Sequence, residues 1–181
     1  MGDAGNALIW LLGTLLGVIL TIVLNEPVQS AAARLAAGFV PRSPRNLTGL
    51  WRLEYGYVVR GVKKKETQIV EISSFAGSVY GRTVFSQVHK YEIKGRLKQE
   101  LYFTGHWHSI LPGQAYHGAF QLILHPDGSE LSGKWLGFSE KLQTVNHDTW
   151  VWQRLSHKVT KAERKKLAEQ LQAELQSVSN P

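Results

Sequence analysis

The chain has 181 residues, of which 43% are hydrophobic and 19% charged, enough for one compact domain with short additional segments. It contains no cysteine, which excludes disulfides, cysteine-ligated metal centres and thiol catalysis. The net charge is +7, and the first 40 residues contribute only Arg34 against Asp3 and Glu26, so the excess lies in the remainder. A basic domain attracts phosphate groups or anionic lipid headgroups, and charge alone does not distinguish the two.

The first predicted element is a single transmembrane helix, because Ala7 to Leu24 contains no charged residue. A helix of this length extends about 27 Å, close to the hydrocarbon thickness of a bilayer. A cleaved signal peptide is the alternative. However, the residues before the stretch include Asp3 and no basic side chain, whereas signal peptides begin with a positive region. We therefore expect an uncleaved anchor over residues 1–26.

The charges that follow the predicted span indicate its orientation. Arg34, Arg42 and Arg45 lie downstream and no basic residue lies upstream, so the positive-inside rule places the N-terminus outside and the rest in the cytoplasm. Gly13 and Gly17 have the G-x-x-x-G spacing that lets two membrane helices approach and form an oligomer. Glycine is also common in membrane helices without this role, so both interpretations stay open.

Residues 27–46 are predicted to form a juxtamembrane helix and a linker, since Val28 to Val40 is alanine-rich, too short to span, and followed by prolines. From residue 47 onward, short alternating segments rich in Val, Ile, Tyr, Trp and Thr predict β-strands. We expect eight strands: Leu47 to Val59, Glu66 to Ser74, Ser78 to Phe85, Lys90 to Lys98, Glu100 to His108, Ala115 to His125, Glu130 to Phe138 and Asp148 to Leu155.

A glycine recurs in most of these strands, with an apolar residue two positions before it and an apolar residue or threonine two positions after it. Glycines on one face of successive strands let a sheet curl tightly, because the missing side chain permits close approach. Eight antiparallel strands close into an up-and-down barrel that is filled or holds one small ligand. Residues 47–157 are therefore predicted to form an all-β barrel, with recurring glycines at Gly49, Gly81, Gly95, Gly105, Gly118 and Gly133.

The predicted barrel resembles the calycins, the group of lipocalins and avidins. The resemblance rests on Gly49-x-Trp51 in the first strand and Arg154 near the end of the last. It implies that the Arg154 side chain covers Trp51 and closes one end. With its membrane segment, the chain resembles the membrane-anchored β-barrel effectors of bacterial cyclic-oligonucleotide antiphage signalling. Those effectors usually carry two membrane helices, whereas this sequence predicts one.

This second resemblance implies a function. It implies a non-enzymatic protein of the bacterial inner membrane, without a cofactor, whose cytoplasmic barrel binds a cyclic oligonucleotide. Binding would then favour a homo-oligomer formed through the membrane helix and disrupt the membrane lipids around it. The alternative function is a tethered lipocalin-like barrel that binds a lipid or an apolar metabolite, or that serves as a protein-docking platform.

Residues at the predicted open end offer contacts for such a ligand. Inward-facing aromatic residues far from the predicted closed end are expected to ring the mouth: Tyr57, Tyr91, Trp107, Tyr116 and Trp150. Aromatic rings stack on nucleobases, but they also simply fill small barrels. Lys63, Lys64 and Lys65 are expected in the loop between the first two strands, where they would either bind phosphates or form a solvated turn.

Residues 158–181 are predicted to form an amphipathic helix after the barrel. Thr160 and Glu163 form a capping box at its start, and Leu167, Leu171 and Leu175 recur on one face. This face could pair with a second copy, and the basic residues near the start could touch anionic lipid. Three leucines are too few for a coiled coil, so oligomerisation is expected mainly through the membrane helix.

An enzymatic alternative rests on His106, His108 and His117. The first two lie on one face of a predicted strand, and pairing Gly105 with Gly118 would place His117 opposite His106. Three such histidines could hold zinc with an open position for water, although histidines on an outer face are more often solvated. No Ser-His-Asp, P-loop or G-x-G-x-x-G motif is present, so the sequence favours neither a metal site nor catalysis.

Overall fold

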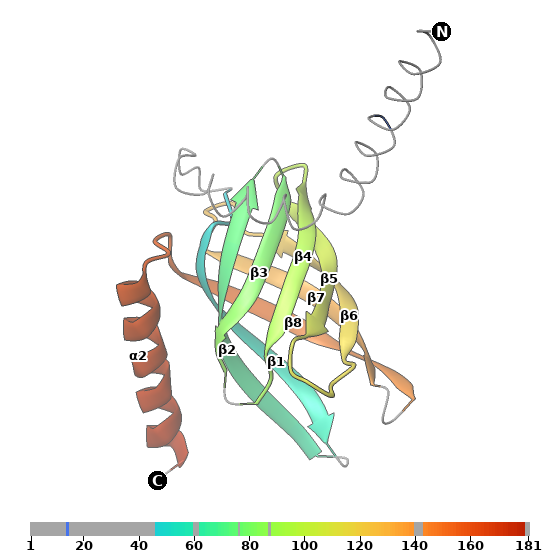
Figure 1. Ribbon diagram of the computed structural model, residues 1–181, viewed down its shortest axis with the longest axis vertical. Helices are drawn as coiled ribbons and strands as arrows, with labels where there is room; N and C mark the ends of the chain where they lie inside the picture. Colours follow the sequence, from blue (N-terminus) through green and yellow to red (C-terminus); the bar gives the residue numbers. More distant parts are fainter. Residues whose placement is uncertain are drawn as a thin grey trace, which may run out of the picture.

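The computed structural model in Figure 1 describes Thr14 and residues 46–59, 62–75, 77–86, 88–139 and 143–179. Within these residues, no helix has both the length and the apolar character needed to cross a bilayer. Apart from Thr14, the predicted membrane and juxtamembrane helices, with Gly13 and Gly17, lie outside the described residues. They stay predictions.

The strands form a closed antiparallel barrel in chain order, in which β8 pairs back to β1 (Figure 1). This confirms the predicted all-β barrel and is consistent with a calycin-like fold. A helix, α2 (Lys161–Ser179), follows the barrel. The strands are β1 (Gly49–Val59), β2 (Val62–Phe75), β3 (Ser78–Phe85), β4 (Tyr91–Lys98), β5 (Tyr102–Ser109), β6 (His117–Leu124), β7 (Glu130–Ser139) and β8 (Thr144–Ser156).

Two strands begin earlier than the sequence predicts. β2 begins at Val62 and β8 at Thr144, each four residues before its predicted start. β1 and β2 stay paired as far as Val59 with Val62, so Lys63 to Lys65 lie in a strand and the predicted loop is wrong. The reason is that a hairpin end exposed to water needs no apolar alternation. Backbone pairing holds it while the charged side chains stay solvated.

The barrel interior is lined by apolar and aromatic side chains from every strand, on alternate positions as the sequence predicts. Full burial of one large apolar side chain stabilises a fold by about 1.5 to 3 kcal/mol, so this cluster is the main source of stability. Its buried members are Leu47, Trp51, Leu53, Tyr55, Val70, Ile72, Val79, Tyr91, Ile93, Phe103, Trp107, Phe120, Leu122, Leu124, Leu131, Trp135, Trp150 and Trp152.

The recurring glycines allow neighbouring strands to approach on the concave side. Gly95 and Gly105 lie opposite each other on β4 and β5. A Cβ atom at Gly105 would collide with the Lys94 carbonyl oxygen and would lie 2.6 Å from the Gly95 Cα. A Cβ atom at Gly118 would meet the Trp107 ring at 2.8 Å. These positions therefore accept no side chain without movement of the backbone or of a core indole.

At one end of the barrel the Arg154 side chain lies over Trp51, as the calycin resemblance implies. The Arg154 guanidinium lies 4.5 Å from the centre of the Trp51 ring, and its Nη2 donates to the Asn46 carbonyl oxygen at 2.8 Å. The Trp51 indole donates to the Leu47 carbonyl oxygen at 2.8 Å. Burial lowers the pKa of Arg154 to about 10, so the guanidinium stays charged at neutral pH and retains its attraction to the ring.

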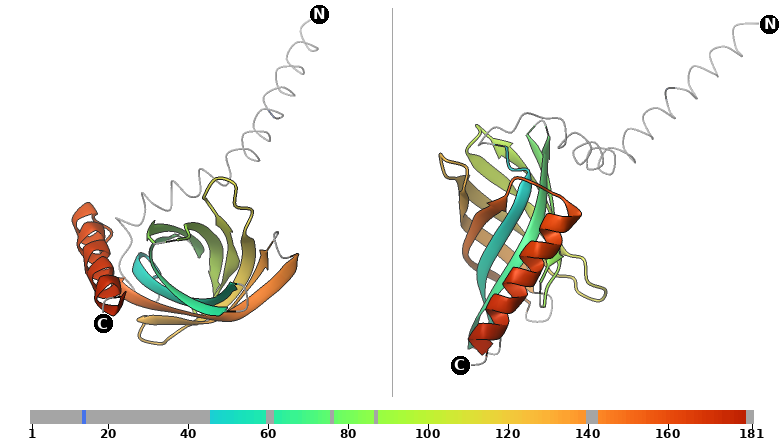
Figure 2. Two further views of the ribbon diagram at one scale, coloured as in Figure 1. Left: turned by 90° about the horizontal axis from the view of Figure 1, so that it is seen from below. Right: turned by 90° about the vertical axis from the view of Figure 1, so that its left-hand side faces the viewer.

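Helix α2 lies outside the barrel along β1, β2 and β3 (Figure 2). The Thr160 hydroxyl accepts a hydrogen bond from the Glu163 backbone N–H at 3.1 Å, so the predicted cap is confirmed. Leu171 is buried against Leu50 and Ile69 of the barrel wall. The predicted leucine face therefore packs on its own barrel, which leaves it unavailable to pair with a second copy in this arrangement.

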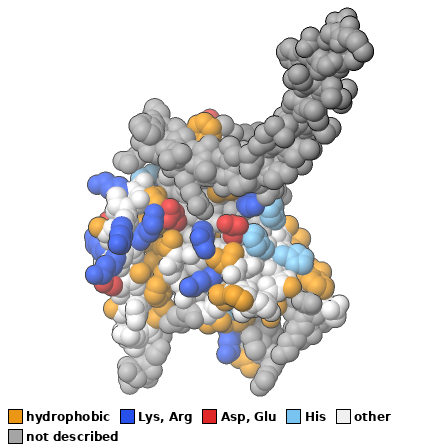
Figure 3. Space-filling model, viewed as in Figure 1, with side chains coloured by type: hydrophobic (Ala, Val, Ile, Leu, Met, Phe, Trp, Pro, Cys, Tyr) orange, Lys and Arg blue, Asp and Glu red, His pale blue; other side chains and the backbone are white. Residues whose placement is uncertain are grey.

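Ion pairs flank the contact between α2 and the barrel. Arg52 Nη1 lies 3.0 Å from Glu174 Oε2, and Arg164 Nε lies 2.9 Å from Glu71 Oε2. The basic side chains gathered over α2 are visible in Figure 3. Their predicted contact with anionic lipid stays a prediction.

Substitution of Gly105 by alanine should destabilise the barrel. The new methyl group must displace the β4 backbone, which costs about 1 to 3 kcal/mol, and we expect a corresponding loss of free energy of unfolding in urea titrations. Gly113 provides the control, since it has a positive φ of 74° but nothing within 4 Å of an added Cβ. Gly113→Ala should cost about 1 kcal/mol through its backbone alone. Equal effects of the two substitutions would contradict this account.

Candidate functional site

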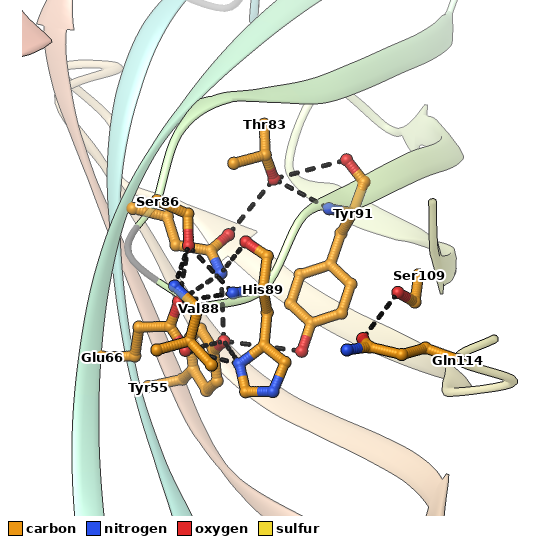
Figure 4. A network of polar contacts seen from close by, with 10 residues as sticks. Tyr55, Glu66, Thr83, Ser86, Val88, His89, Tyr91, Ser109 and Gln114 are labelled. Carbon is orange, nitrogen blue, oxygen red and sulfur yellow. Dashed lines mark hydrogen bonds and ion pairs between the residues drawn. The ribbon is translucent and has the colours of Figure 1, made fainter. Parts of the chain in front are cut away.

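A cluster of polar side chains lies inside the barrel, toward the end opposite Trp51 and Arg154 (Figure 4). Glu66 and Gln68 project inward from β2 and are buried, and His89 lies in the connection between β3 and β4. Polar groups inside an apolar core cost free energy unless they are hydrogen-bonded. Their partners therefore determine what this cluster can do.

Glu66 is the centre of the cluster. Its Oε2 accepts hydrogen bonds from the Tyr55 hydroxyl at 2.8 Å and from His89 Nδ1 at 2.6 Å. Its Oε1 accepts from the Ser86 hydroxyl at 2.6 Å, from Gln68 Nε2 at 3.1 Å and from the backbone N–H of His89 at 3.2 Å. Burial alone would raise the pKa of this carboxyl, but the hydrogen bonds outweigh burial and hold the pKa of Glu66 at about 2. The carboxylate is ionised at neutral pH, and both its oxygens are fully engaged.

The other polar groups of the cluster satisfy one another. Gln68 Nε2 also donates to the Tyr55 hydroxyl at 3.0 Å and to the His89 carbonyl oxygen at 3.1 Å. The Thr83 hydroxyl donates to Gln68 Oε1 at 3.2 Å and accepts from the Tyr91 backbone N–H at 2.9 Å. The network thus joins β1, β2, β3 and β4 and fixes the connection that carries His89.

His89 uses only one of its two ring nitrogens within the network. Because ionised Glu66 can only accept, Nδ1 of His89 carries the hydrogen of the 2.6 Å contact. The other ring nitrogen, Nε2, has no hydrogen-bond partner among the described residues. A histidine held by a carboxylate at one nitrogen presents the other in a fixed direction. Nε2 can accept a hydrogen bond when the ring is neutral and donate one when it is protonated.

Three tyrosines surround the imidazole. The Tyr91 ring stacks parallel to it, with centroids 5.9 Å apart. The Tyr57 and Tyr116 rings meet it edge-on, with centroid distances of 5.5 Å and 6.4 Å. Burial, followed by the nearby charge of Glu66, raises the pKa of Tyr57 above its ordinary value, so this hydroxyl stays protonated and can donate. The end of the barrel thus presents three phenol rings around one imidazole.

The structure separates the five aromatic residues predicted at the mouth into two groups. Tyr57 and Tyr116 are half-buried and lie beside His89. Tyr91, Trp107 and Trp150 are only 7%, 7% and 3% exposed and belong to the core. A molecule at the mouth would contact the first group, and the second group would contact a bound molecule only if it entered the interior.

The three predicted lysines do not all lie on the same face of the sheet. Lys64 lies opposite Tyr57 in the register of β1 and β2, so both side chains leave the same inner face of the sheet. Lys65 points to the other face, where its Nζ lies 2.5 Å from Glu54 Oε2. Lys63 has the same parity as Lys65. Only Lys64 is therefore positioned toward the mouth.

The outer-face histidines do not form the predicted set. His108 lies opposite His117, whereas His106 lies opposite Ala119, so the predicted pairing of His106 with His117 is wrong by two residues. The prediction paired Gly105 with Gly118 because both glycines belong to the recurring pattern. In the structure, Gly118 of β6 lies opposite Trp107 of β5. Figure 3 shows histidines on this face, and His108 Nε2 lies 3.5 Å from Glu92 Oε2. Among the described residues, no group of three or more His, Asp or Glu side chains could hold a metal ion.

Sequence reasoning missed Glu66, Gln68 and His89. The signal for the first two was available, because both share the inward parity of Val70 and Ile72 in β2. Two polar side chains on the apolar face of a strand indicate a buried polar cluster. No comparable signal exists for His89, which lies outside any strand and reaches Glu66 only through the fold.

Comparison with known proteins adds no family: no protein-family model, curated protein or solved structure significantly matches this chain.

The ionisation of Glu66 predicts a pH dependence of stability. Its pKa in the folded protein, about 2, lies below the ordinary value of 4.5, so its contribution is complete above pH 4.5 and disappears as pH falls toward 2. The shift corresponds to about 3 kcal/mol. We expect Glu66→Gln to lower the free energy of unfolding at neutral pH, and the gap to the unsubstituted protein to close between pH 4.5 and 2 in urea titrations. A gap that does not change with pH would show that Glu66 is not ionised in the folded state.

Proposed function

We propose that this protein is a non-enzymatic, membrane-anchored barrel that binds a cyclic oligonucleotide at the end where His89 lies. His89 carries this proposal, because its Nδ1 is fixed by a buried carboxylate and its Nε2 has no partner among the described residues. Such an arrangement presents one directed hydrogen-bonding atom amid aromatic rings. Planar ligands with polar edges, such as nucleobases, match a site of this kind.

Lys64 supports the choice of a phosphate-containing ligand. It leaves the inner face of β2 directly opposite Tyr57, so a cation and an aromatic ring lie next to each other at the same end as His89. Bases joined by phosphates suit this combination, since the rings can stack on the bases and the lysine can contact a phosphate. The half-buried rings of Tyr57 and Tyr116 would contact the base without repacking of the core.

The membrane part of the proposal concerns residues outside the described ones. The anchor predicted from Ala7 to Leu24 would hold the barrel on the cytoplasmic side of a bacterial inner membrane. Ligand binding would favour an oligomer in which membrane helices meet through Gly13 and Gly17. Close packing of several such helices would disturb the surrounding lipid. In this proposal the protein acts as an antiphage effector.

A second candidate function has one observation in its favour. The interior cluster consists of apolar and aromatic residues down to the closed end, which suits a fatty acid or an apolar metabolite in a lipocalin-like barrel. For such a ligand, the hydrocarbon part would lie among the core rings and the polar head would lie beside His89.

Substitution of Lys64 separates the two functions. If the ligand carries phosphates, Lys64→Gln should weaken binding by about three- to tenfold and make the affinity less sensitive to salt, because salt screens the contact between lysine and phosphate. Lys63→Gln is the matched control, since it removes the same charge from the opposite face and should leave affinity within about twofold. The measurement is calorimetry on the full chain in detergent, titrated with cyclic dinucleotides, cyclic trinucleotides and fatty acids.

Each outcome of this titration assigns the function. Saturable binding of a cyclic oligonucleotide that is sensitive to Lys64 and not to Lys63 supports the proposal. Binding of a fatty acid alone, unchanged by either substitution, favours the lipocalin-like function. If no member of the panel binds, the nucleotide proposal fails.

A further inference from the structure

The barrel interior contains indole N–H groups that lack acceptors. The Nε1 atoms of Trp107, Trp135, Trp150 and Trp152 are buried and have no hydrogen-bond partner among the described residues. Trp51, by contrast, donates to the Leu47 carbonyl oxygen at 2.8 Å. A buried donor without an acceptor costs about 1 to 3 kcal/mol, and native proteins satisfy the large majority of such side-chain groups. Four in one core therefore require an explanation.

Three of these indoles belong to the part of the core next to the Glu66 network. The Trp107 ring lies 6.1 Å from the Trp135 ring and 6.5 Å from the Trp150 ring. The Tyr55 ring lies 6.5 Å from that of Trp135 and 6.4 Å from that of Trp150, and its hydroxyl donates to Glu66. The unsatisfied donors are thus continuous with the network that fixes His89.

The side-chain acceptors of the Glu66 network already receive hydrogen bonds from within the network. The Glu66 carboxylate already receives hydrogen bonds from Tyr55, Gln68 and Ser86. It also receives hydrogen bonds from the backbone N–H and from the Nδ1 of His89. Gln68 Oε1 accepts from Thr83. The interior therefore combines indole donors that have no acceptor among the described residues with the negative charge of Glu66.

We propose that the interior binds an uncharged planar group that carries carbonyl or ring-nitrogen acceptors, with the indole N–H groups of Trp107, Trp135 and Trp150 as its donors. An acceptor-rich heterocycle removes the cost of the unsatisfied donors, and its faces match the surrounding rings. A carboxylate or phosphate in this place would lie near ionised Glu66 and be repelled. In a nucleotide, the base would enter and the phosphate would stay at Lys64.

This inference rests on the proposed function, because it assumes that the barrel takes up a ligand. It adds a base preference. On the edge that carries N7, guanine presents two acceptors, N7 and the carbonyl oxygen, where adenine presents N7 and an amino donor. A donor-rich interior that binds this edge should therefore favour guanine. Cyclic diguanylate and cyclic diadenylate are matched probes, since they carry the same phosphates and the same ring skeleton.

The test uses the indole N–H signals in nitrogen-15 spectra of the full chain in detergent micelles. Trp51 is the internal reference, since its N–H is already bonded and should not move. We expect cyclic diguanylate to shift at least two of the Trp107, Trp135 and Trp150 signals in the direction of a new hydrogen bond. We also expect it to bind about tenfold more tightly than cyclic diadenylate in calorimetry, about the effect of one well-placed hydrogen bond.

Two variants separate hydrogen bonding from packing. Trp107→Phe keeps an aromatic ring but removes the N–H, and should reduce the preference for guanine over adenine by about three- to tenfold. Trp51→Phe, the control, removes a satisfied donor at the closed end and should leave that preference unchanged even if it lowers stability. The preference is a ratio between two probes, so partial unfolding of either variant does not imitate the effect.

The outcomes separate this inference from the proposed function. If both dinucleotides bind equally and the core indole signals do not move, the ligand sits only at the mouth, so this inference fails and the proposed function survives. If neither dinucleotide binds, the nucleotide function fails, and lumichrome, an uncharged planar heterocycle with two carbonyl groups, tests the interior alone. Movement of the same indole signals by lumichrome supports the inference, and unmoved signals overturn it.

Discussion

The close fit of inward glycines to inward aromatic rings is the constraint on which this barrel depends. The Trp107 ring lies over Gly118 and Gly137, where an added Cβ would come within 2.8 Å and 2.7 Å of it. Without the glycines the indoles would not fit, and without the indoles the strands would enclose unfilled space, which a folded core does not tolerate. The glycines that allow the strands to curve and the aromatic rings that occupy the core therefore depend on each other.

The aromatic side chains of the core carry polar atoms, the indole N–H and tyrosine hydroxyl groups, into the barrel interior. The hydrogen bonding of these atoms differs between the two ends of the barrel. At the closed end the Trp51 indole bonds to the chain itself, and Arg154 covers the ring. Toward the other end, Glu66 satisfies the Tyr55 hydroxyl, but the Nε1 atoms of four core indoles have no hydrogen-bond partner among the described residues. At the closed end the Trp51 indole N–H and the Arg154 Nη2 are therefore bonded to carbonyl oxygens of the chain itself, whereas the end that holds Glu66 and His89 keeps the Nε2 of His89 without a partner among the described residues.

The ionised Glu66 holds the connection that carries His89, because Ser86 and His89 of that connection both donate hydrogen bonds to its carboxylate. Its carboxylate receives the side chain and backbone N–H of His89 and the Ser86 hydroxyl, so one charged residue of β2 positions the whole segment after β3. On the outer wall, α2 covers Leu50 and Ile69 and stiffens the same strands β1 and β2. The site is therefore held from both faces of the sheet.

The sequence by itself determined the barrel, its inward residues, the Trp51 and Arg154 closure and the capped C-terminal helix, because strand alternation, glycine spacing and capping are local patterns. Only the tertiary structure decided the register of β5 with β6, the separation of Lys64 from its neighbours and the approach of His89 to Glu66. Each of these depends on how strands pair across the barrel. A shift of two residues preserves every local pattern but changes which side chains meet.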